Sequence, residues 1–159
     1  MNAYKEKLIN EILPELLKLE KTKGEPTIVR ILEGKEGLRI IVRMLFESKQ
    51  KNICVYGGTG KSYEALKYEM PRIANETGAV NIKGRIITGT QLKGKLFTKL
   101  KNFQTRYIEE LTPSSTMIFD DKVSINVFDE KIFVILIESK SVADSYRKYF
   151  ECLWRTAKK

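Results

Sequence analysis

The stretch between residues 105 and 138 limits the fold more than any other part of this chain. Four runs rich in β-branched and aromatic residues follow one another with connections of about one to four residues: TRYIEEL (105–111), STMIFD (115–120), KVSINVF (122–128) and KIFVILIE (131–138). Connections this short join antiparallel strands, because a parallel neighbour needs a much longer crossover. The sequence therefore predicts hairpins or a meander here, with the uninterrupted apolar run 132–137 in the centre of the sheet.

The first half of the chain instead alternates helices and strands. We expect a helix at about 34–48, strands at 52–56 and 84–89, a helix after the glycine turn at 57–60, and a basic amphipathic helix over 91–101. A last helix over 141–159 begins with an S-x-x-D signal formed by Ser141 and Asp144. The predicted fold class is α/β (α+β), with a mixed sheet and flanking helices.

Length and hydropathy limit how the chain is organised. Its 159 residues, 42% of them apolar, fit one ordinary domain. We expect an N-terminal linker or dimerisation helix over 1–24, followed by one domain over 25–159. No apolar stretch approaches the roughly 18 residues that cross a bilayer, and the N-terminus lacks the apolar core of a signal peptide. The sequence thus predicts a cytoplasmic protein with no membrane partner.

The N-terminal stretch has the spacing of a coiled-coil seam. Its apolar residues repeat at intervals of three and four: Ile9, Ile12, Leu16 and Leu19. This seam predicts a homodimer, although packing of the same face onto the domain's own core explains the pattern equally well.

The chain contains no histidine. This absence removes imidazole as a base, nucleophile or metal ligand, and with it Ser-His-Asp and Cys-His catalysis. The two cysteines, Cys54 and Cys152, lie in apolar runs without a C-x-x-C pair and are expected to be buried, reduced thiols. No metal or other cofactor and no catalytic residue is predicted.

The motif GGTGKS at 57–62 is similar to the end of a phosphate-binding loop. That loop needs G-x-x-x-x-G-K-[ST], and here its first glycine is replaced by Val55, so the turn is too short to wrap a phosphate. TMIFD (116–120) imitates the strand and aspartate of such a site, but Asp120 is expected in a tight hairpin turn. A small nucleotide phosphotransferase is therefore the least favoured function. A ligand contact remains a hypothesis for the turn, against a purely conformational role: Gly57, Gly58, Thr59, Gly60 and Ser62.

Positive charge is concentrated between residues 81 and 106, which hold seven of the nine excess charges and no acidic residue. The candidates for anion or nucleic-acid contact are Lys83, Arg85, Lys93, Lys95, Lys99 and Lys101, with Arg106 at the end of the segment. Direct nucleic-acid binding is thus an alternative function. A solvated basic surface that serves only solubility explains the same pattern.

Four stretches resemble the effector domain of the TrmB-like family of archaeal transcriptional regulators, in the family's order and spacing. They are IVRILEGKEGLRIIV (28–42), ICVYGGTGKSYEAL (53–66), STMIFDDKVSINV (115–127) and SVADSYRKYFECLW (141–154). The resemblance covers about residues 4–157. It implies a phospholipase-D-like fold that has lost catalysis, since phospholipase D enzymes use histidines from H-x-K motifs and this chain has none.

The resemblance also implies a role. The domain would be a dimerising regulatory module, responsive to a small molecule, that reaches DNA only through a winged helix-turn-helix located elsewhere. Some family members bind sugars through an additional C-terminal region, which we do not expect in this chain, so no sugar-contacting residue is carried over.

Overall fold

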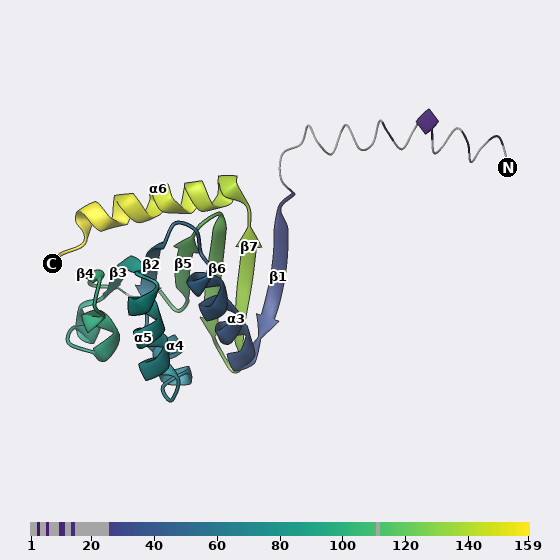
Figure 1. Ribbon diagram of the computed structural model, residues 1–159. Coiled ribbons are helices and arrows are strands. Elements are labelled where there is room, and N and C mark those ends of the chain that lie inside the picture. Colours follow the sequence, from purple (N-terminus) through teal and green to yellow (C-terminus); the bar gives the residue numbers. More distant parts are fainter. Residues whose placement is uncertain (1–2, 4–5, 7–9, 12–13, 15–25, 111) are drawn as a thin grey trace.

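The computed structural model describes residues 26–110 and 112–159, with the isolated positions 3, 6, 10, 11 and 14. These residues build a seven-stranded mixed sheet in the order β1-β7-β6-β5-β2-β3-β4 (Figure 1). The strands are β1 (Ile28–Glu33), β2 (Asn52–Gly58), β3 (Lys83–Gly89), β4 (Phe103–Ile108), β5 (Ser115–Phe119), β6 (Lys122–Phe128) and β7 (Ile132–Glu138). Pairing is parallel within β2-β3-β4 and antiparallel across the remainder of the sheet.

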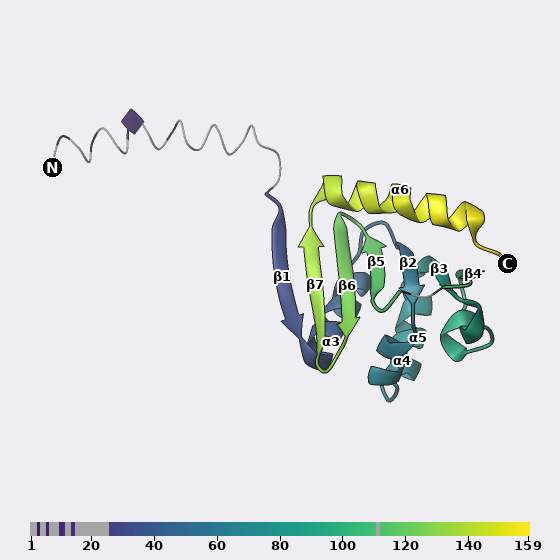
Figure 2. The same ribbon diagram turned by 180° about the vertical axis from the view of Figure 1, so that it is seen from behind.

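Helices cover both faces of the sheet (Figures 1 and 2). One face carries α3 (Gly34–Phe46), α4 (Lys61–Ala65) and α5 (Met70–Ala79), and α6 (Lys140–Thr156) crosses the other. Each layer has its own core. Leu38 and Ile41 of α3 pack with Val134 and Leu136 on the first face. On the second face, Phe150 and Trp154 of α6 belong to a cluster that includes Cys54, Ile87 and Val123. A mixed sheet with flanking helices is therefore confirmed.

The β5-β6-β7 meander is present as predicted, but the prediction for β4 was wrong. β4 pairs in parallel with β3 at the edge of the sheet, while β5 pairs with β2. The strand ends at Ile108 rather than residue 111, so six residues separate it from Ser115. That length allows the chain to pass the ends of two strands, which lie about 4.8 Å apart. β7 is an interior strand, paired with β6 on one side and with β1 on the other, but it lies one strand from the edge of the sheet rather than in the middle.

The basic helix predicted over 91–101 does not form. Two short 3₁₀ turns, η2 (Thr90–Leu92) and η3 (Leu96–Lys99), take its place. Gly94 lies between them at φ +88°, in the left-handed region that ends a right-handed helix. The leucines have helical spacing, but the backbone conformation of the glycine between them interrupts the helix.

Two further predictions need correction or remain open. The N-cap of α6 is Ser139, whose Oγ accepts the Val142 amide at 3.5 Å, whereas Asp144 pairs with Lys140 and Arg147. The predicted seam residues lie outside the described part of the chain, so the linker helix and the dimer stay predictions: Ile9, Ile12, Leu16 and Leu19.

Asp120 occupies the β5-β6 turn, as predicted, and joins three segments there. Its backbone has φ +46°. Its carboxylate accepts the Lys49 and Gln50 amides, both at 3.0 Å, and its carbonyl accepts a hydrogen bond from the Arg147 guanidinium. The turn thus ties the connection after α3 to the hairpin and to α6.

Substitution of Asp120 tests this anchor. Asp120→Ala should lower the free energy of unfolding by about 2–3 kcal/mol, because two hydrogen bonds to a charged acceptor are lost and alanine is disfavoured at positive φ. Asp120→Asn, which keeps an acceptor and tolerates this conformation, should cost about 1 kcal/mol or less. The neighbouring Asp121→Ala is the control, and urea denaturation is the measurement. Equal losses for all three variants would contradict the anchoring role.

Candidate functional site

The glycine turn requires glycine at two positions, because the backbone there has a positive φ and neighbouring atoms leave no room for a Cβ. Gly57 has φ +67°, and a Cβ added there would lie 2.1 Å from Thr112 Oγ1. Gly60 has φ +78°, and its added Cβ would lie 2.8 Å from the ring of Phe97. The helix that follows, α4, has only five residues, too few to give an anion-binding N-terminus. Among the predicted ligand residues, the two glycines thus have a structural explanation.

Gly57 and Asp120, the two halves of the nucleotide-like pattern, lie at opposite ends of β2. Gly57 and Gly58 end the strand, whereas Asp120 contacts residues 49 and 50, which precede it. A seven-residue strand spans about 20 Å. Asp120 therefore cannot share a phosphate or a metal ion with the glycine turn. Within the described residues, no three carboxylate or cysteine side chains lie close enough together to hold a metal ion.

The turn borders a cavity of about 420 Å³ between the sheet and the helices α3, α4 and α5. Its floor comes from β2, β3, β5 and β6, and the segment 97–103 closes one side. Most of the lining is aliphatic or aromatic, including Val42, Val55, Leu66, Ile73, Ile86 and Phe97. Gly58, Thr59, Gly60 and Ser62 also line it, but Gly57 does not. Four of the five predicted ligand residues are thus brought together at one cavity.

Two polar side chains lie on the floor of this cavity. Ser115 of β5 and Asn126 of β6 are directly paired in the antiparallel ladder and both line the cavity. Asn126 is only 2% exposed, and its Oδ1 has no hydrogen-bond partner among the described residues. A buried amide oxygen without a partner is uncommon, since it costs about 1–3 kcal/mol. Two buried polar side chains on the floor of a mostly apolar cavity mark this place as the candidate site.

Sequence reasoning missed both floor residues, Ser115 and Asn126. The pattern of β6 shows why Asn126 was missed. In KVSINVF the alternation places Val123, Ile125 and Val127 on one face, which makes Ser124 and Asn126 read as solvent-facing. The structure covers both faces, so Ser124 and Asn126 are buried at 0% and 2% exposure. The sequence shows two polar positions on one face of this strand. Only the packing of α3 on that face shows that both are buried.

The basic segment divides into two groups. Arg85 and Arg106 lie against α6: Arg85 pairs with Glu151 and stacks on Phe150, and Arg106 donates to the Trp154 carbonyl at 2.5 Å. The guanidinium of Arg106 also lies 4.5 Å from the Trp154 ring centroid. These two arginines hold α6 to the parallel strands, so they are poor candidates for an external anion.

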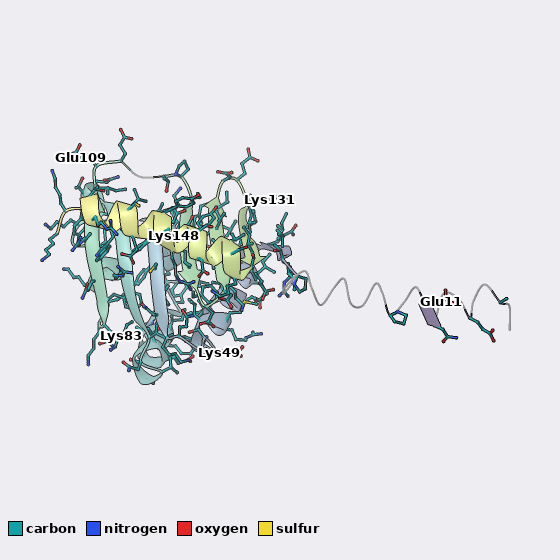
Figure 3. The ribbon with its side chains drawn as sticks, turned by 90° about the horizontal axis from the view of Figure 1, so that it is seen from above. Glu11, Lys49, Lys83, Glu109, Lys131 and Lys148 are labelled. Atoms are coloured by element: carbon teal, nitrogen blue, oxygen red, sulfur yellow. The ribbon has the colours of Figure 1, made fainter. Side chains whose placement is uncertain are left out.

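The five lysines of the segment are exposed, namely Lys83, Lys93, Lys95, Lys99 and Lys101. They do not form one compact patch. Lys83 begins β3, at the end of the sheet where Lys49 also lies (Figure 3). Lys93 follows the opposite end of that strand and stacks on Tyr107. Lys101 reaches the rim of the cavity.

The two cysteines differ in exposure, which corrects the expectation that both are buried. Cys54 is buried beneath α6, and Cys152 is exposed on the outer side of that helix. Burial raises the pKa of the Cys54 thiol, against the opposing effect of the nearby Arg85 charge. Cys54 is therefore an unreactive core thiol.

Comparison with known proteins identifies the fold. No family model matches the chain, and no curated protein sequence does so. Among solved structures, TrmBL2, an archaeal chromatin protein whose structure shows a novel mode of DNA binding, aligns over 98% of this chain with a TM-score of 0.59 and 20% identity. This chain spans 65% of the length of TrmBL2.

Two further structures have the same fold. NucT from Helicobacter pylori aligns over 83% of this chain and 98% of its own, with a TM-score of 0.62 and 8% identity. Nuc from Salmonella typhimurium, a phospholipase D family member, aligns over 84% and 97%, with a TM-score of 0.58 and 13% identity. The fold is therefore phospholipase-D-like. In the described part of the chain, no helix is both long and apolar enough to cross a membrane.

The Arg85–Glu151 pair predicts a pH-dependent stability. The hydrogen bond from Arg85 lowers the pKa of Glu151 below its ordinary value of 4.5, so the pair stabilises the fold above that pH. The contribution is lost as pH falls through the lowered value. Glu151→Gln should cost about 0.5–1 kcal/mol at pH 7, since the pair is partly solvent-exposed, and much less at pH 3.

The control is Glu109→Gln, which removes an 85% exposed carboxylate lying 3.9 Å from Lys158. It should leave stability unchanged at both pH values in urea denaturation. A loss for Glu151→Gln that is the same at pH 3 as at pH 7 would show that the side chain acts through packing rather than through its charge.

Proposed function

We propose that this chain is a non-catalytic, ligand-responsive regulatory module of a DNA-associated protein of the TrmB-like kind. The observation that carries the proposal is the apolar cavity with a polar floor, set in a phospholipase-D-like fold whose chain has no histidine. A cavity of this size and character is typical of a small-molecule site.

The likeness to TrmBL2 supports the DNA association. That protein is an archaeal chromatin protein, and 98% of this chain aligns with part of it. The likeness to Nuc and NucT would instead favour an enzyme. The resemblance stated above implies that phospholipase D enzymes use histidine side chains for catalysis. This chain cannot perform that chemistry with its own side chains, since histidine is absent from its sequence.

A direct structural route connects the cavity with the N-terminal part of the chain. Val42, Leu45 and Phe46 of α3 line the cavity. The helix begins at Gly34, immediately after β1 ends at Glu33, and β1 is the edge strand that follows the N-terminal segment. A ligand that shifts α3 would therefore act on β1. Through β1 it would change how protomers or attached domains are arranged.

The first test concerns catalysis. The protein should leave a supercoiled plasmid and bis(4-nitrophenyl) phosphate intact, with or without Mg²⁺, because it has no imidazole to act as nucleophile or acid. Gel electrophoresis and 4-nitrophenolate absorbance are the measurements. Hydrolysis that a Lys61→Ala or a Ser115→Ala variant abolishes would show that the chain is an enzyme and would overturn the proposal.

The second test separates regulation through another domain from direct nucleic-acid binding. Under the proposal, the chain binds a labelled 24-base-pair duplex only through general charge attraction, so affinity at 50 mM salt should fall to undetectable levels at 200 mM. Fluorescence anisotropy measures both. Sub-micromolar binding at 200 mM salt that Lys95→Glu with Lys99→Glu abolishes would favour the direct binder. The charge-matched control is Lys131→Glu with Lys148→Glu, which lie outside the basic segment, in the β6-β7 turn and on α6 (Figure 3).

A further inference from the structure

We propose that the cavity binds an apolar alcohol or phenol, with its hydrocarbon body between α3, α5 and the sheet and its hydroxyl at Asn126 and Ser115. This inference deepens the proposed function by naming the chemical class of the ligand. It depends on the cavity, on the unpartnered amide at its floor, and on the lack of charge inside it.

The volume sets the size of the ligand. A dry apolar cavity of about 150 Å³ is large enough for benzene. The cavity here has about 420 Å³, which lies within the range of natural small-molecule sites. It therefore accepts a molecule of roughly 10–15 non-hydrogen atoms, such as two fused rings or a medium-length branched chain.

The wall chemistry excludes strongly polar ligands. Among the described residues that line the cavity, Lys101 alone is charged, and it is exposed at the rim. Apart from the two floor residues, the polar side chains of the lining are all half-buried or exposed, namely Thr59, Ser62, Tyr63, Asn75 and Thr77. A sugar or a nucleotide would leave many hydroxyl or phosphate groups without partners against Val55, Ile73 and Ile86. Such burial is costly, because a polar group that loses its water without gaining a hydrogen bond loses free energy. The hydrocarbon part of the ligand must therefore dominate.

The floor requires one polar group. Asn126 lines the cavity, and its Oδ1 is buried without a partner among the described residues. Ser115 lines the same cavity from the adjacent strand. An asparagine amide can turn about its terminal bond and present either an acceptor or two donors. A hydroxyl both donates and accepts, so it satisfies either orientation and can also bond to Ser115. An ammonium or carboxylate at the floor would have no counter-ion beside it, because Lys101 lies at the exposed rim.

Ligands can reach the cavity beside α5. Ala74, Asn75 and Gly78 of this helix line the cavity and are exposed, as is Lys101 across from them. Asn126 and Ser115 are buried, whereas these rim residues are exposed, so the polar end of the bound molecule would lie deepest.

The test uses two probes with the same number of non-hydrogen atoms, 1-naphthol and 1-methylnaphthalene. Each is titrated into the full-length, methyl-labelled protein, and NMR follows the methyl groups of Val55 and Ile86 in the cavity and of Val123 on the opposite face. We expect 1-naphthol to shift the cavity methyl signals and to leave those of Val123 unchanged. Absence of saturable shifts for 1-naphthol would overturn the proposal.

The Asn126→Leu variant tests the polar floor. Leucine keeps a similar shape and removes the amide, so 1-naphthol should bind about five- to tenfold more weakly, the effect of one lost hydrogen bond. Binding of 1-methylnaphthalene should change by less than about twofold, since it uses no hydrogen bond. Equal effects on the two probes, or no effect on either, would overturn the assignment of the hydroxyl to Asn126.

Ser124→Ala is the matched control. Ser124 lies two residues before Asn126 on the same face of β6, and its Oγ is likewise buried without a partner among the described residues, but it does not line the cavity. Both probes should bind this variant as they bind the unchanged protein. Asn126→Leu should also remain folded with a raised melting temperature, because a buried unpaired amide has been removed. Unfolding of Asn126→Leu instead would show that the amide is required by the fold and would overturn its role as a ligand contact.

Failure of this proposal can be distinguished from failure of the proposed function. The readout is binding alone and involves neither DNA nor catalysis. Saturable binding of 1-naphthol by a chain that also cleaves plasmid would leave the ligand assignment intact and sink the regulatory role. A chain that neither hydrolyses these substrates nor binds 1-naphthol would overturn the ligand assignment and leave the regulatory role intact.

Discussion

The antiparallel pairing of β2 with β5 is the interaction on which the rest of this structure depends. It joins a parallel group of strands, β2-β3-β4, to the antiparallel group β5-β6-β7-β1 in one sheet. Its register places Tyr56 opposite Thr116 and Cys54 opposite Ile118. The glycine end of β2 therefore lies beside Ser115, and the other end lies beside Asp120. Both the cavity floor and the separation of Asp120 from the glycine turn follow from this one register.

The sequence predicted those parts of the fold in which local pattern and tertiary packing agree. The meander follows from short connections and β-branched runs, and α3 follows from an apolar stripe that packs on the sheet. β1 was not predicted, because IVRILE passes directly into α3 without a loop. The pairing of β4 was not predictable from connection length, since six residues suffice for either a hairpin or a passage across two strand ends.

The candidate site was only partly predictable, and the physical reason lies in how strands are read. Thr59, Gly60 and Ser62 stood out because they imitate a phosphate loop, yet their contribution here is to border an apolar cavity. Asn126 was not predicted as a site residue, because the alternating pattern of β6 places its polar residues on the solvent-facing side. Only the packing of helices on both faces turns such a residue into a buried one. Likewise, the charge of Arg85 and Arg106 was visible, but their attachment to α6 was not.

The unpaired amide of Asn126 links the stability of the fold to occupancy of the cavity. Without a ligand, a buried acceptor that lacks a partner costs the folded state about 1–3 kcal/mol, which is a sizeable part of a domain's total stability. A ligand hydroxyl supplies the missing hydrogen bond only in the folded state. Its binding therefore stabilises the protein in proportion to the logarithm of its concentration relative to the dissociation constant. Because α3 forms one wall of the cavity and continues from β1, this stabilisation acts on the elements that lead to the N-terminal segment.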